Sequence, residues 1–397
     1  MNSITVPEIL LPADGTDMSC WAVNACDQYT SDAAYWHKVE RLTAGKPSAF
    51  NLIFPEIFLN DEPEKRILRI NEKMREYLSG GIFKKLDKGF ILVERQTPSG
   101  VRTGIILSVD LEEYSFEKDA NTPIRSTEAT ILERIPPRVE IRRNAPLELP
   151  HVMLLYDDIQ NSVLNCVRKG NTLYSFDLMC GGGKVKGTFI ENSEEVKDAF
   201  YSLCDGRDIN GKNSPLLFAA GDGNHSLATA KTCWESVKKT LSEEQRATHP
   251  ARFALVEAVN IYDKALKFEP IHRYVKTQNV QLLESLLQTS GKGKAYTVID
   301  GIKTDIAFPQ DIPVGIRWLD GVISRFIAEH GGEVDYIHGE DDLIKLTQCG
   351  GVGVLLPSIK KEDFFSLIIS GGNLPKKTFS MGEGYEKRYY IEAKIIK

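Results

Sequence analysis

The sequence predicts an α/β (α+β) protein in which helices flank mixed sheets. Short apolar runs typical of strands recur along the chain between amphipathic helical patterns. From about residue 280 onward, helix and strand patterns alternate as far as residues 350–357, which is typical of an α/β layer. The chain has 397 residues, more than one ordinary core uses. We therefore expect three regions: an N-terminal α+β region at 1–150, a core at 151–280 and a C-terminal α/β region at 281–397.

The N-terminal region offers three regular elements. The first 60 residues are rich in Pro, Asp and aromatic side chains, and we expect irregular structure there. Residues 63–81 predict a helix, because apolar residues recur at helical spacing. Residues 89–111 predict a β-hairpin around a Thr-Pro-Ser-Gly turn. Residues 126–135 predict a short helix that Pro136-Pro137 ends.

Strands and helices alternate through the rest of the chain. We expect, in order, a strand at 151–158, a hairpin at 173–191, a helix at 194–203, a strand at 215–221, a helix at 226–241 and a strand at 252–263. After the alternating region, a polar loop from residue 371 leads into a final strand.

Composition excludes several classes of protein. The net charge of −6 argues against a nucleic-acid binder driven by overall charge. No run of 18 apolar residues is present, so we expect no membrane span, and the first residues lack the pattern of a signal peptide. The 7 cysteines include no Cys-x-x-Cys pair and are odd in number, which indicates reduced thiols in a cytoplasmic protein.

The stretch "FAAGDGNHSLATAK", residues 218–231, is the strongest candidate for a site. An apolar strand leads into a glycine-rich turn and then a helix start. The first N–H groups of a helix lack partners, and glycines let a phosphate approach the backbone, so this order suits an anion. The spacing is neither that of a P-loop nor that of a dinucleotide fingerprint. The alternative is a tight strand-to-helix turn with Ser226 as its cap.

Each residue of this turn has an expected role. Asp222 could bind a metal ion or act as a base, and His225 could contact phosphate or move a proton. The remaining candidates, which we expect to bind the phosphates of a cofactor, are Gly221, Gly223, Asn224 and Ser226.

Residues 124–143 form a second candidate, because they carry several arginines and glutamates. Arginine forks suit phosphate and carboxylate oxygens. Arg125 and Glu128 are three residues apart, so in a helix they would share a face. We expect Arg125 to bind the cofactor and Glu128 to take part in catalysis. The alternative is a solvated, salt-bridged helix face.

Two further stretches offer groups that bind phosphate. In "FEPIHRYV", His272 and Arg273 follow a proline, although such a pair is often structural. In "LPKKTFSMGEG", Lys376, Lys377 and Ser380 lie in a loop with glycines at both ends, which suggests a lid that closes over a ligand. A plain surface loop is the alternative.

Taken in order, these motifs resemble a bacterial and archaeal family known as domain of unknown function 1015. The resemblance covers nearly the whole chain and rests on "CDQYTS", "VRTGIILSVDLEEY", "IRSTEATILERIPPR", "AAGDGNHSLATAK", "FEPIHRYV" and "LPKKTFSMGEG". The central motif in much of that family reads Asp-Gly-His-His-Arg. Here it reads Asp222-Gly223-Asn224-His225-Ser226, so no guanidinium follows the histidine; Lys231 or a nearby arginine could supply that charge.

The central motif is also similar to one in the ParB and sulfiredoxin superfamily, which includes the free serine kinases. There a comparable turn at a helix start contacts nucleotide phosphate. This similarity rests on about five residues, so it is an analogy at the level of fold. It implies a ParB/sulfiredoxin-like core, followed by the C-terminal α/β layer.

Three functions compete at this point. The first is a phosphotransferase that uses a nucleotide (ATP, ADP or CTP) and Mg²⁺ on a small-molecule substrate. The second is a non-catalytic sensor of a nucleotide or metabolite. The third, by analogy with ParB, is a nucleic-acid-associated factor, which the acidic charge disfavours. A homodimer is compatible with each of them.

Overall fold

The computed structural model describes residues 2–30, 32–59, 61–128, 135–204, 208–209, 212–288 and 291–397. Two compact units are present: Met1–Leu266 together with Glu383–Lys397, and Lys267–Gly382. The second unit is therefore an insertion in the chain of the first. The chain passes from the first unit to the second at residue 267. The three regions expected from the sequence stay a prediction.

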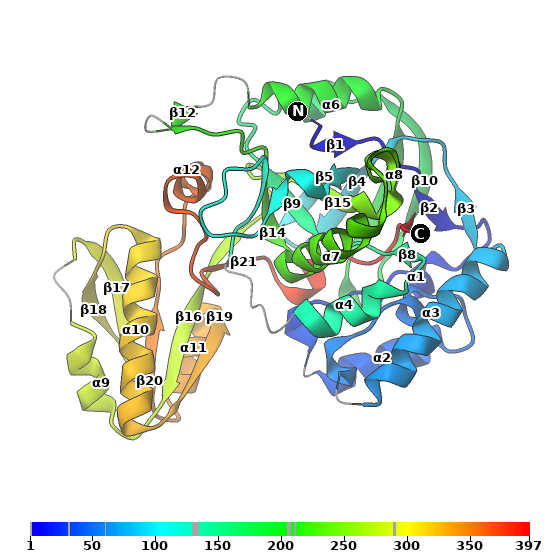
Figure 1. Ribbon diagram of the computed structural model, residues 1–397. Helices are drawn as coiled ribbons and strands as arrows, with labels where there is room; N and C mark the ends of the chain where they lie inside the picture. The colour runs from blue at the N-terminus through cyan, green and yellow to red at the C-terminus, as the bar shows by residue number, and fades with distance from the viewer. Residues whose placement is uncertain are drawn as a thin grey trace. The chain divides into compact units, whose positions relative to one another are not determined.

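The first unit is built on one mixed sheet of ten described strands (Figure 1). Across the sheet the strands are β10 (Lys169–Asp177), β11 (Lys184–Ile190), β4 (Phe90–Thr97), β5 (Gly100–Asp110), β15 (Phe253–Asn260), β9 (Met153–Tyr156), β14 (Phe218–Asp222), β7 (Ile124–Ser126) and β6 (Tyr114–Ser115), with β1 (Ile4–Thr5) beside β5. Strand β9 runs antiparallel to β14 and parallel to β15. The mixed α/β class predicted from the sequence is confirmed.

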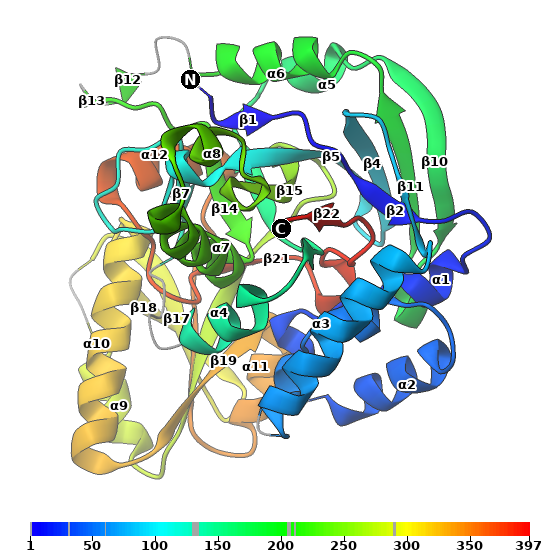
Figure 2. The same cartoon turned by 45° about the vertical axis from the view of Figure 1, so that its right-hand side comes forward.

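Both faces of this sheet are covered by helices and loops. In β4, Phe90 and Leu92 pack into one core cluster, whereas Ile91 and Val93 pack into the other. Consecutive residues of a strand point to opposite faces, so the four consecutive apolar residues at the start of β4 need cover on both sides. Helix α7 (Asn224–Val237) covers one face, and α3 (Pro63–Ser79) covers the other. Helix α4 (Ile135–Arg143) packs beside α7 (Figure 2).

Smaller elements complete the first unit. The other helices are α1 (Met18–Trp21), α2 (Ala33–Thr43), α5 (Ser162–Asn165), α6 (Ser193–Ser202) and α8 (Glu243–Thr248). Three strand pairs lie outside the main sheet: β2 (Leu10–Pro12) with β3 (Phe83–Lys85), β8 (Leu147–Glu148) with β22 (Lys394–Ile395), and β12 (Asp208–Ile209) with β13 (Lys212–Asn213).

The second unit has its own sheet and its own core. The strand order is β18 (Ile302–Phe308), β17 (Gly293–Ile299), β20 (Val352–Leu355), β16 (Phe268–Lys276) and β19 (Glu333–His338), and β21 (Phe379–Met381) extends the pairing of β16. Its helices are α9 (Val280–Leu286), α10 (Ile312–His330), α11 (Glu340–Thr347) and α12 (Lys361–Gly371). This is the alternation of helix and strand that the sequence predicts after residue 280.

Two local predictions are wrong. The short helix expected at 126–135 is not formed at its start, because Ser126 ends strand β7; residues 129–134 lie outside the described residues. Helix α4 instead begins at Ile135, so Pro136-Pro137 lie in its first turn, where a missing N–H costs little. The first 60 residues also contain a regular helix, α2, whose N-cap is Asp32.

The segment Glu383–Lys397, here called the C-terminal segment, returns to the first unit after the insertion. Arg388 is buried in the first unit, where its guanidinium donates to Glu257 at 2.8 Å and to Glu392 at 2.7 Å. Its Nε donates to the carbonyl of Pro150 at 3.1 Å. One arginine therefore joins strand β15, the approach to strand β9 and the C-terminal segment.

Replacing Arg388 with Met should destabilise the protein strongly. The change leaves the carboxylates of Glu257 and Glu392 buried without their shared partner, which costs about 3–5 kcal/mol in free energy of unfolding. Urea denaturation followed by circular dichroism measures it.

The matched control is Arg168→Met. Arg168 pairs with Glu195 at 2.6 Å, but both side chains are 63% exposed, so the loss should be at most about 1 kcal/mol. Equal effects of the two substitutions would contradict the role given to the buried arginine.

Candidate functional site

The start of helix α7 is shaped by an irregularity in strand β14. Ala220 pairs with Leu154, but Asp222 pairs with Met153, so Gly221 is an extra residue in the ladder. Such a bulge redirects the side chain that follows it. Gly223 then has a φ of +78°, and a Cβ there would lie 3.0 Å from a methyl group of Val152. Only glycine fits this turn without strain.

The helix that follows begins at a half-buried turn. Residues 221–226 are all half-buried, whereas residues 227–230 are buried. The N-cap residue is Gly223, which has no side chain to cap the helix. The first N–H groups of a helix have no partner within the helix itself, and together with the helix dipole they favour a negative charge at such a position.

Asp222 faces a lysine from the C-terminal segment. Its carboxylate lies 3.5 Å from Lys387 Nζ and accepts a hydrogen bond from the Gly223 N–H at 2.8 Å. Burial raises the pKa of Asp222, but Lys387, His151 and the Gly223 N–H outweigh burial and lower it overall. The carboxylate is therefore ionised at neutral pH.

His151 lies two residues before strand β9, and its imidazole has a partner at each nitrogen. Nε2 is 3.1 Å from Ser226 Oγ, and Nδ1 is 2.9 Å from the hydroxyl of Tyr390. Burial lowers the pKa of His151, although Asp222 and Asp27 raise it in part. The ring is therefore uncharged at neutral pH and can accept a proton.

Two other parts of the chain contribute groups that interact electrostatically with this site. Burial raises the pKa of Cys26 to about 11, and the charge of Asp222 adds to this shift, so Cys26 is a thiol and not a nucleophile. Arg138, on α4, forms an ion pair with Glu56. Burial lowers the pKa of Arg138, while Asp27 raises it in part.

Asn224 fixes the turn to strand β7 rather than pointing at open space. Its Oδ1 accepts hydrogen bonds from Ser126 Oγ at 2.7 Å and from the Thr127 N–H at 3.1 Å. Its Nδ2 donates to Ala220 O at 3.4 Å. Asn224 therefore holds two of the predicted motifs together.

Arg125 and Glu128 do not share a helical face, because Arg125 lies in strand β7. The guanidinium of Arg125 is buried and donates to Asn121, Thr122 and Ser214. Glu128 follows the strand, is half-buried, and its carbonyl accepts from Ser126 Oγ. The expectation that the two residues share a face assumed a helix that the structure does not form at Arg125. The cofactor-binding role of Arg125 and the catalytic role of Glu128 stay predictions.

His225 is the second residue of α7, and its side chain is half-buried. Thr229 Oγ1 donates to its backbone carbonyl at 2.7 Å, as is common inside helices. Its predicted catalytic role stays a prediction.

The remaining predicted residues lie in the second unit. His272 is buried and accepts from the Leu356 N–H at 3.1 Å. Arg273 pairs with Asp320 at 2.8 Å and donates to the carbonyls of Lys376 and Lys377, so it holds the backbone of the predicted loop. Ser380 is buried and donates to Gly382 O. Their part in ligand binding stays a prediction.

Sequence reasoning missed three residues of the site: His151, Lys387 and Tyr390. None of them lies in a recognisable motif, since each is single in an apolar or mixed stretch. The available signal was indirect. His151 is a polar residue shortly before a buried strand, and a side chain there can reach a neighbouring turn. Lys387 and Tyr390 belong to a charged, tyrosine-rich segment near residue 397, from which side chains can also reach such a turn.

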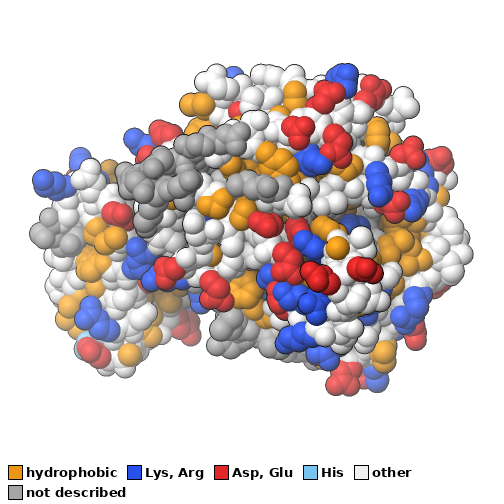
Figure 3. All heavy atoms as spheres, turned by 45° about the horizontal axis from the view of Figure 1, so that its top comes forward, with side chains coloured by type: hydrophobic (Ala, Val, Ile, Leu, Met, Phe, Trp, Pro, Cys, Tyr) orange, Lys and Arg blue, Asp and Glu red, His pale blue; other side chains and the backbone are white. Residues whose placement is uncertain are grey.

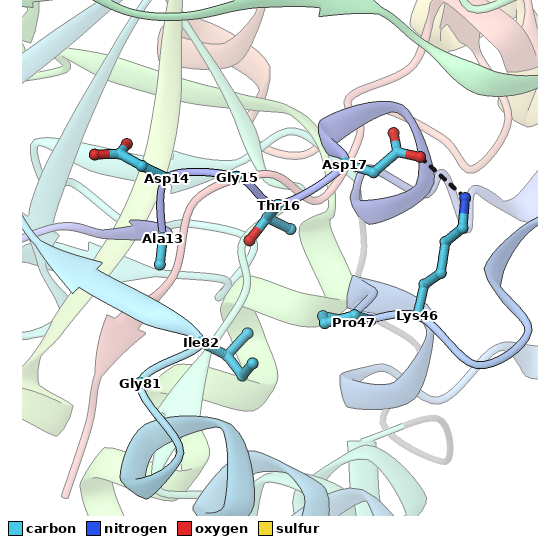
Figure 4. A pocket seen from close by; sticks show the side chains of 9 residues that line it. All are labelled: Ala13, Asp14, Gly15, Thr16, Asp17, Lys46, Pro47, Gly81 and Ile82. Atoms are coloured by element: carbon cyan, nitrogen blue, oxygen red, sulfur yellow. Dashed lines mark hydrogen bonds and ion pairs between the residues drawn. The ribbon is translucent and has the colours of Figure 1, made fainter.

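A separate pocket of about 440 Å³ lies near the start of the first unit. Its lining residues are Ala13, Asp14, Gly15, Thr16, Asp17, Lys46, Pro47, Gly81 and Ile82 (Figure 4). Asp17 pairs with Lys46 at 3.0 Å, and both contact the thiol of Cys20. Burial raises the pKa of that thiol. Asp14, the other charged residue of the lining, pairs with Lys84. None of the residues predicted to form a site lines this pocket.

Basic and acidic side chains are interspersed on the face of the first unit that Figure 3 shows, in its right-hand part. The described residues of that face therefore offer no continuous basic field of the kind that a nucleic-acid backbone attracts. In the described ranges, no helix combines the length and the apolar character that crossing a membrane requires.

Comparison with models of protein families shows which family the chain belongs to. The model described as "Protein of unknown function (DUF1015)" matches residues 10–367. The chain belongs to this family. No curated protein sequence is significantly similar to it.

Three solved structures are similar to the chain at low identity. A free serine kinase in complex with AMP has 11% identity and a TM-score of 0.40, with 72% of this chain and 90% of that one covered. A conserved hypothetical protein from Pyrococcus furiosus has 10% identity and a TM-score of 0.37, with 72% and 93% covered. SbnI from Staphylococcus aureus, truncated at its C-terminus, has 8% identity and a TM-score of 0.37, with 70% and 82% covered.

The lowered pKa of His151 predicts a loss of stability in mild acid. The unfolded chain binds a proton at this histidine near its ordinary pKa of 6.5, whereas the folded protein resists that proton. The stabilising contribution is therefore complete above that value and declines as the pH falls toward the folded pKa.

Urea unfolding of the parent protein and of His151→Gln at several pH values between about 7.5 and 5 measures this contribution. The parent should lose more free energy of unfolding than the variant over this range. An identical pH dependence in the two proteins would show that His151 titrates alike in both states.

Proposed function

We propose that the protein is a phosphotransferase that uses a nucleotide and Mg²⁺ to phosphorylate a small metabolite. The observation that carries this proposal is the Asp222–Lys387 pair at the half-buried start of α7. A helix N-terminus, a lysine and an ionised carboxylate in one half-buried place are the groups that position phosphates and a bound cation.

The phosphates would lie at the turn from Gly221 to Ser226. Glycines at 221 and 223 keep side chains away from the backbone there. Lys387 supplies a positive charge, and its side chain is only 12% exposed, so solvent screens that charge weakly. In this proposal Lys387 takes the part of the arginine that follows the histidine in much of the family.

Asp222 is the residue that would hold Mg²⁺. In the described ranges, no group of three or more His, Cys, Asp or Glu side chains could hold a metal ion. Mg²⁺ at phosphate-transfer sites is commonly bound by one or two carboxylates together with the substrate phosphates and water. One ionised carboxylate beside a phosphate site therefore fits this ion, which would neutralise charge on the phosphates.

The sensor hypothesis shares the binding site but lacks turnover, so two measurements separate the hypotheses. Thermal shift with ATP, ADP and CTP, each with and without Mg²⁺, tests binding. Mass spectrometry of a metabolite mixture incubated with protein and nucleotide tests whether any compound gains a phosphoryl group. Binding without a phosphorylated product would favour the sensor, and the absence of binding would contradict both.

Replacing Lys387 with Met should weaken nucleotide binding by roughly tenfold to a hundredfold, the effect of losing one charge-assisted contact. Asp222 keeps its hydrogen bond from Gly223, so the melting temperature should change little. Isothermal titration with the nucleotide that gives the largest thermal shift measures the affinity.

Two lysines serve as comparisons in the same titration. Lys231→Met is the matched control, because Lys231 is similarly buried, lies on α7 itself and pairs with Glu235 at 2.9 Å. It should leave affinity unchanged. Lys377→Ala tests the loop predicted from the sequence. If that loop contacts the nucleotide, this substitution should lower the affinity by roughly tenfold to a hundredfold. Equal affinities for the parent and the Lys387 variant would contradict the proposed site.

A further inference from the structure

Ser226, His151 and Tyr390 form a chain of side chains in the first unit. Ser226 Oγ is 3.1 Å from His151 Nε2, and the Tyr390 hydroxyl is 2.9 Å from His151 Nδ1. A hydroxyl within reach of a base, with a third group that orients the base, is the general arrangement of an activated nucleophile.

Three separate elements bring these side chains together. Ser226 is the third residue of α7. Strand β9 pairs with β14, and His151 precedes Met153, the residue opposite Asp222, so strand pairing carries the histidine to the start of the helix. Tyr390 comes from the C-terminal segment, whose Arg388 also binds the carbonyl of Pro150, the residue before His151. The arrangement is thus fixed on both sides of the imidazole.

The charge states suit a proton transfer from serine to histidine. The lowered pKa of His151 keeps its ring neutral, and burial raises the pKa of Tyr390, so the phenol keeps its proton. When Nδ1 carries the ring proton and donates it to the Tyr390 oxygen, Nε2 presents its lone pair to Ser226. The start of α7 stabilises negative charge that develops on the serine oxygen.

We propose that Ser226 is a nucleophile that carries the phosphoryl group during transfer, with His151 as its general base and Tyr390 as a positioning residue. This inference rests on the proposed function. Ser226 Oγ attacks the terminal phosphorus of the nucleotide. The Oγ–P bond forms, the bond from phosphorus to the bridging oxygen breaks, and the shortened nucleotide leaves with that electron pair. The serine proton moves to His151 Nε2.

The second half of the reaction restores the enzyme. The hydroxyl oxygen of the metabolite attacks the same phosphorus, and the Oγ–P bond breaks. Ser226 Oγ takes the proton back from His151, and the proton of the acceptor hydroxyl is released to solvent. The acceptor, which ends with the phosphoryl group, is a small molecule with an alcohol group.

The test omits the acceptor, so that the phosphorylated enzyme accumulates. The parent protein is incubated with Mg²⁺ and γ-labelled ATP or CTP or β-labelled ADP, and label on the protein is located by peptide mass spectrometry. We expect one phosphoryl group on Ser226. Ser226→Ala should abolish it and Ser226→Thr should keep part of it. Ser236→Ala, which alters an exposed hydroxyl of the same helix, should leave it unchanged.

The two partners of the serine give further readouts. His151→Gln should slow labelling on the order of a hundredfold, as loss of a general base does. Tyr390→Phe should slow it by at least roughly tenfold while nucleotide affinity and melting temperature stay at the parent values. A Tyr390 variant that lowers stability but not the labelling rate would overturn its positioning role.

The outcomes separate this inference from the function on which it rests. If the protein phosphorylates a metabolite but no label is found on Ser226, the nucleophile is overturned and the phosphotransferase stands. If no nucleotide binds, a fluorophosphonate probe, which reacts with activated serines, decides the nucleophile alone. Modification of Ser226 that depends on His151 would support it, and no modification would overturn it.

Discussion

Arg388 is enclosed in the first unit, where its guanidinium meets Glu257, Glu392 and the carbonyl of Pro150. The cost of leaving any of these charges unpaired in the interior holds the C-terminal segment in one place. Lys387 and Tyr390 lie on either side of this arginine in the sequence. Lys387 reaches Asp222, and Tyr390 reaches His151, which contacts Ser226 of α7. The candidate site therefore depends on a contact made by the last part of the chain.

Most of the secondary structure could be predicted, because its signals are local. The hairpin of β4 and β5, helix α3 and the strand-turn-helix of β14 and α7 follow from apolar spacing, glycines and turn residues. Helix α4 was missed because two adjacent prolines indicate a helix end as readily as a first turn. The order of strands in the sheet could not be predicted, since β9 lies between β14 and β15 through contacts between distant parts of the sequence.

The same distinction applies to the site. The turn around Asp222 was found from its own residues, whereas His151 and Lys387 meet it only through strand pairing and the return of the C-terminal segment. Arg125 is the opposite case. An arginine at this position suggested a bound ligand, but its guanidinium donates to Asn121 and Thr122, in the loop that leads into strand β7. A charged residue in a motif indicates a ligand site only when its side chain is not already bonded to neighbouring residues of its own loop or strand.

The central claim is that phosphate binds at the start of α7, beside Asp222 and Lys387. Amide hydrogen exchange of the whole chain, with and without saturating nucleotide and Mg²⁺, tests this claim most directly, because it reports on the backbone N–H groups themselves. The account predicts slower exchange at residues 223–227 and in the segment that carries Lys387. Saturating binding that leaves these residues unchanged and protects another part of the chain would contradict it.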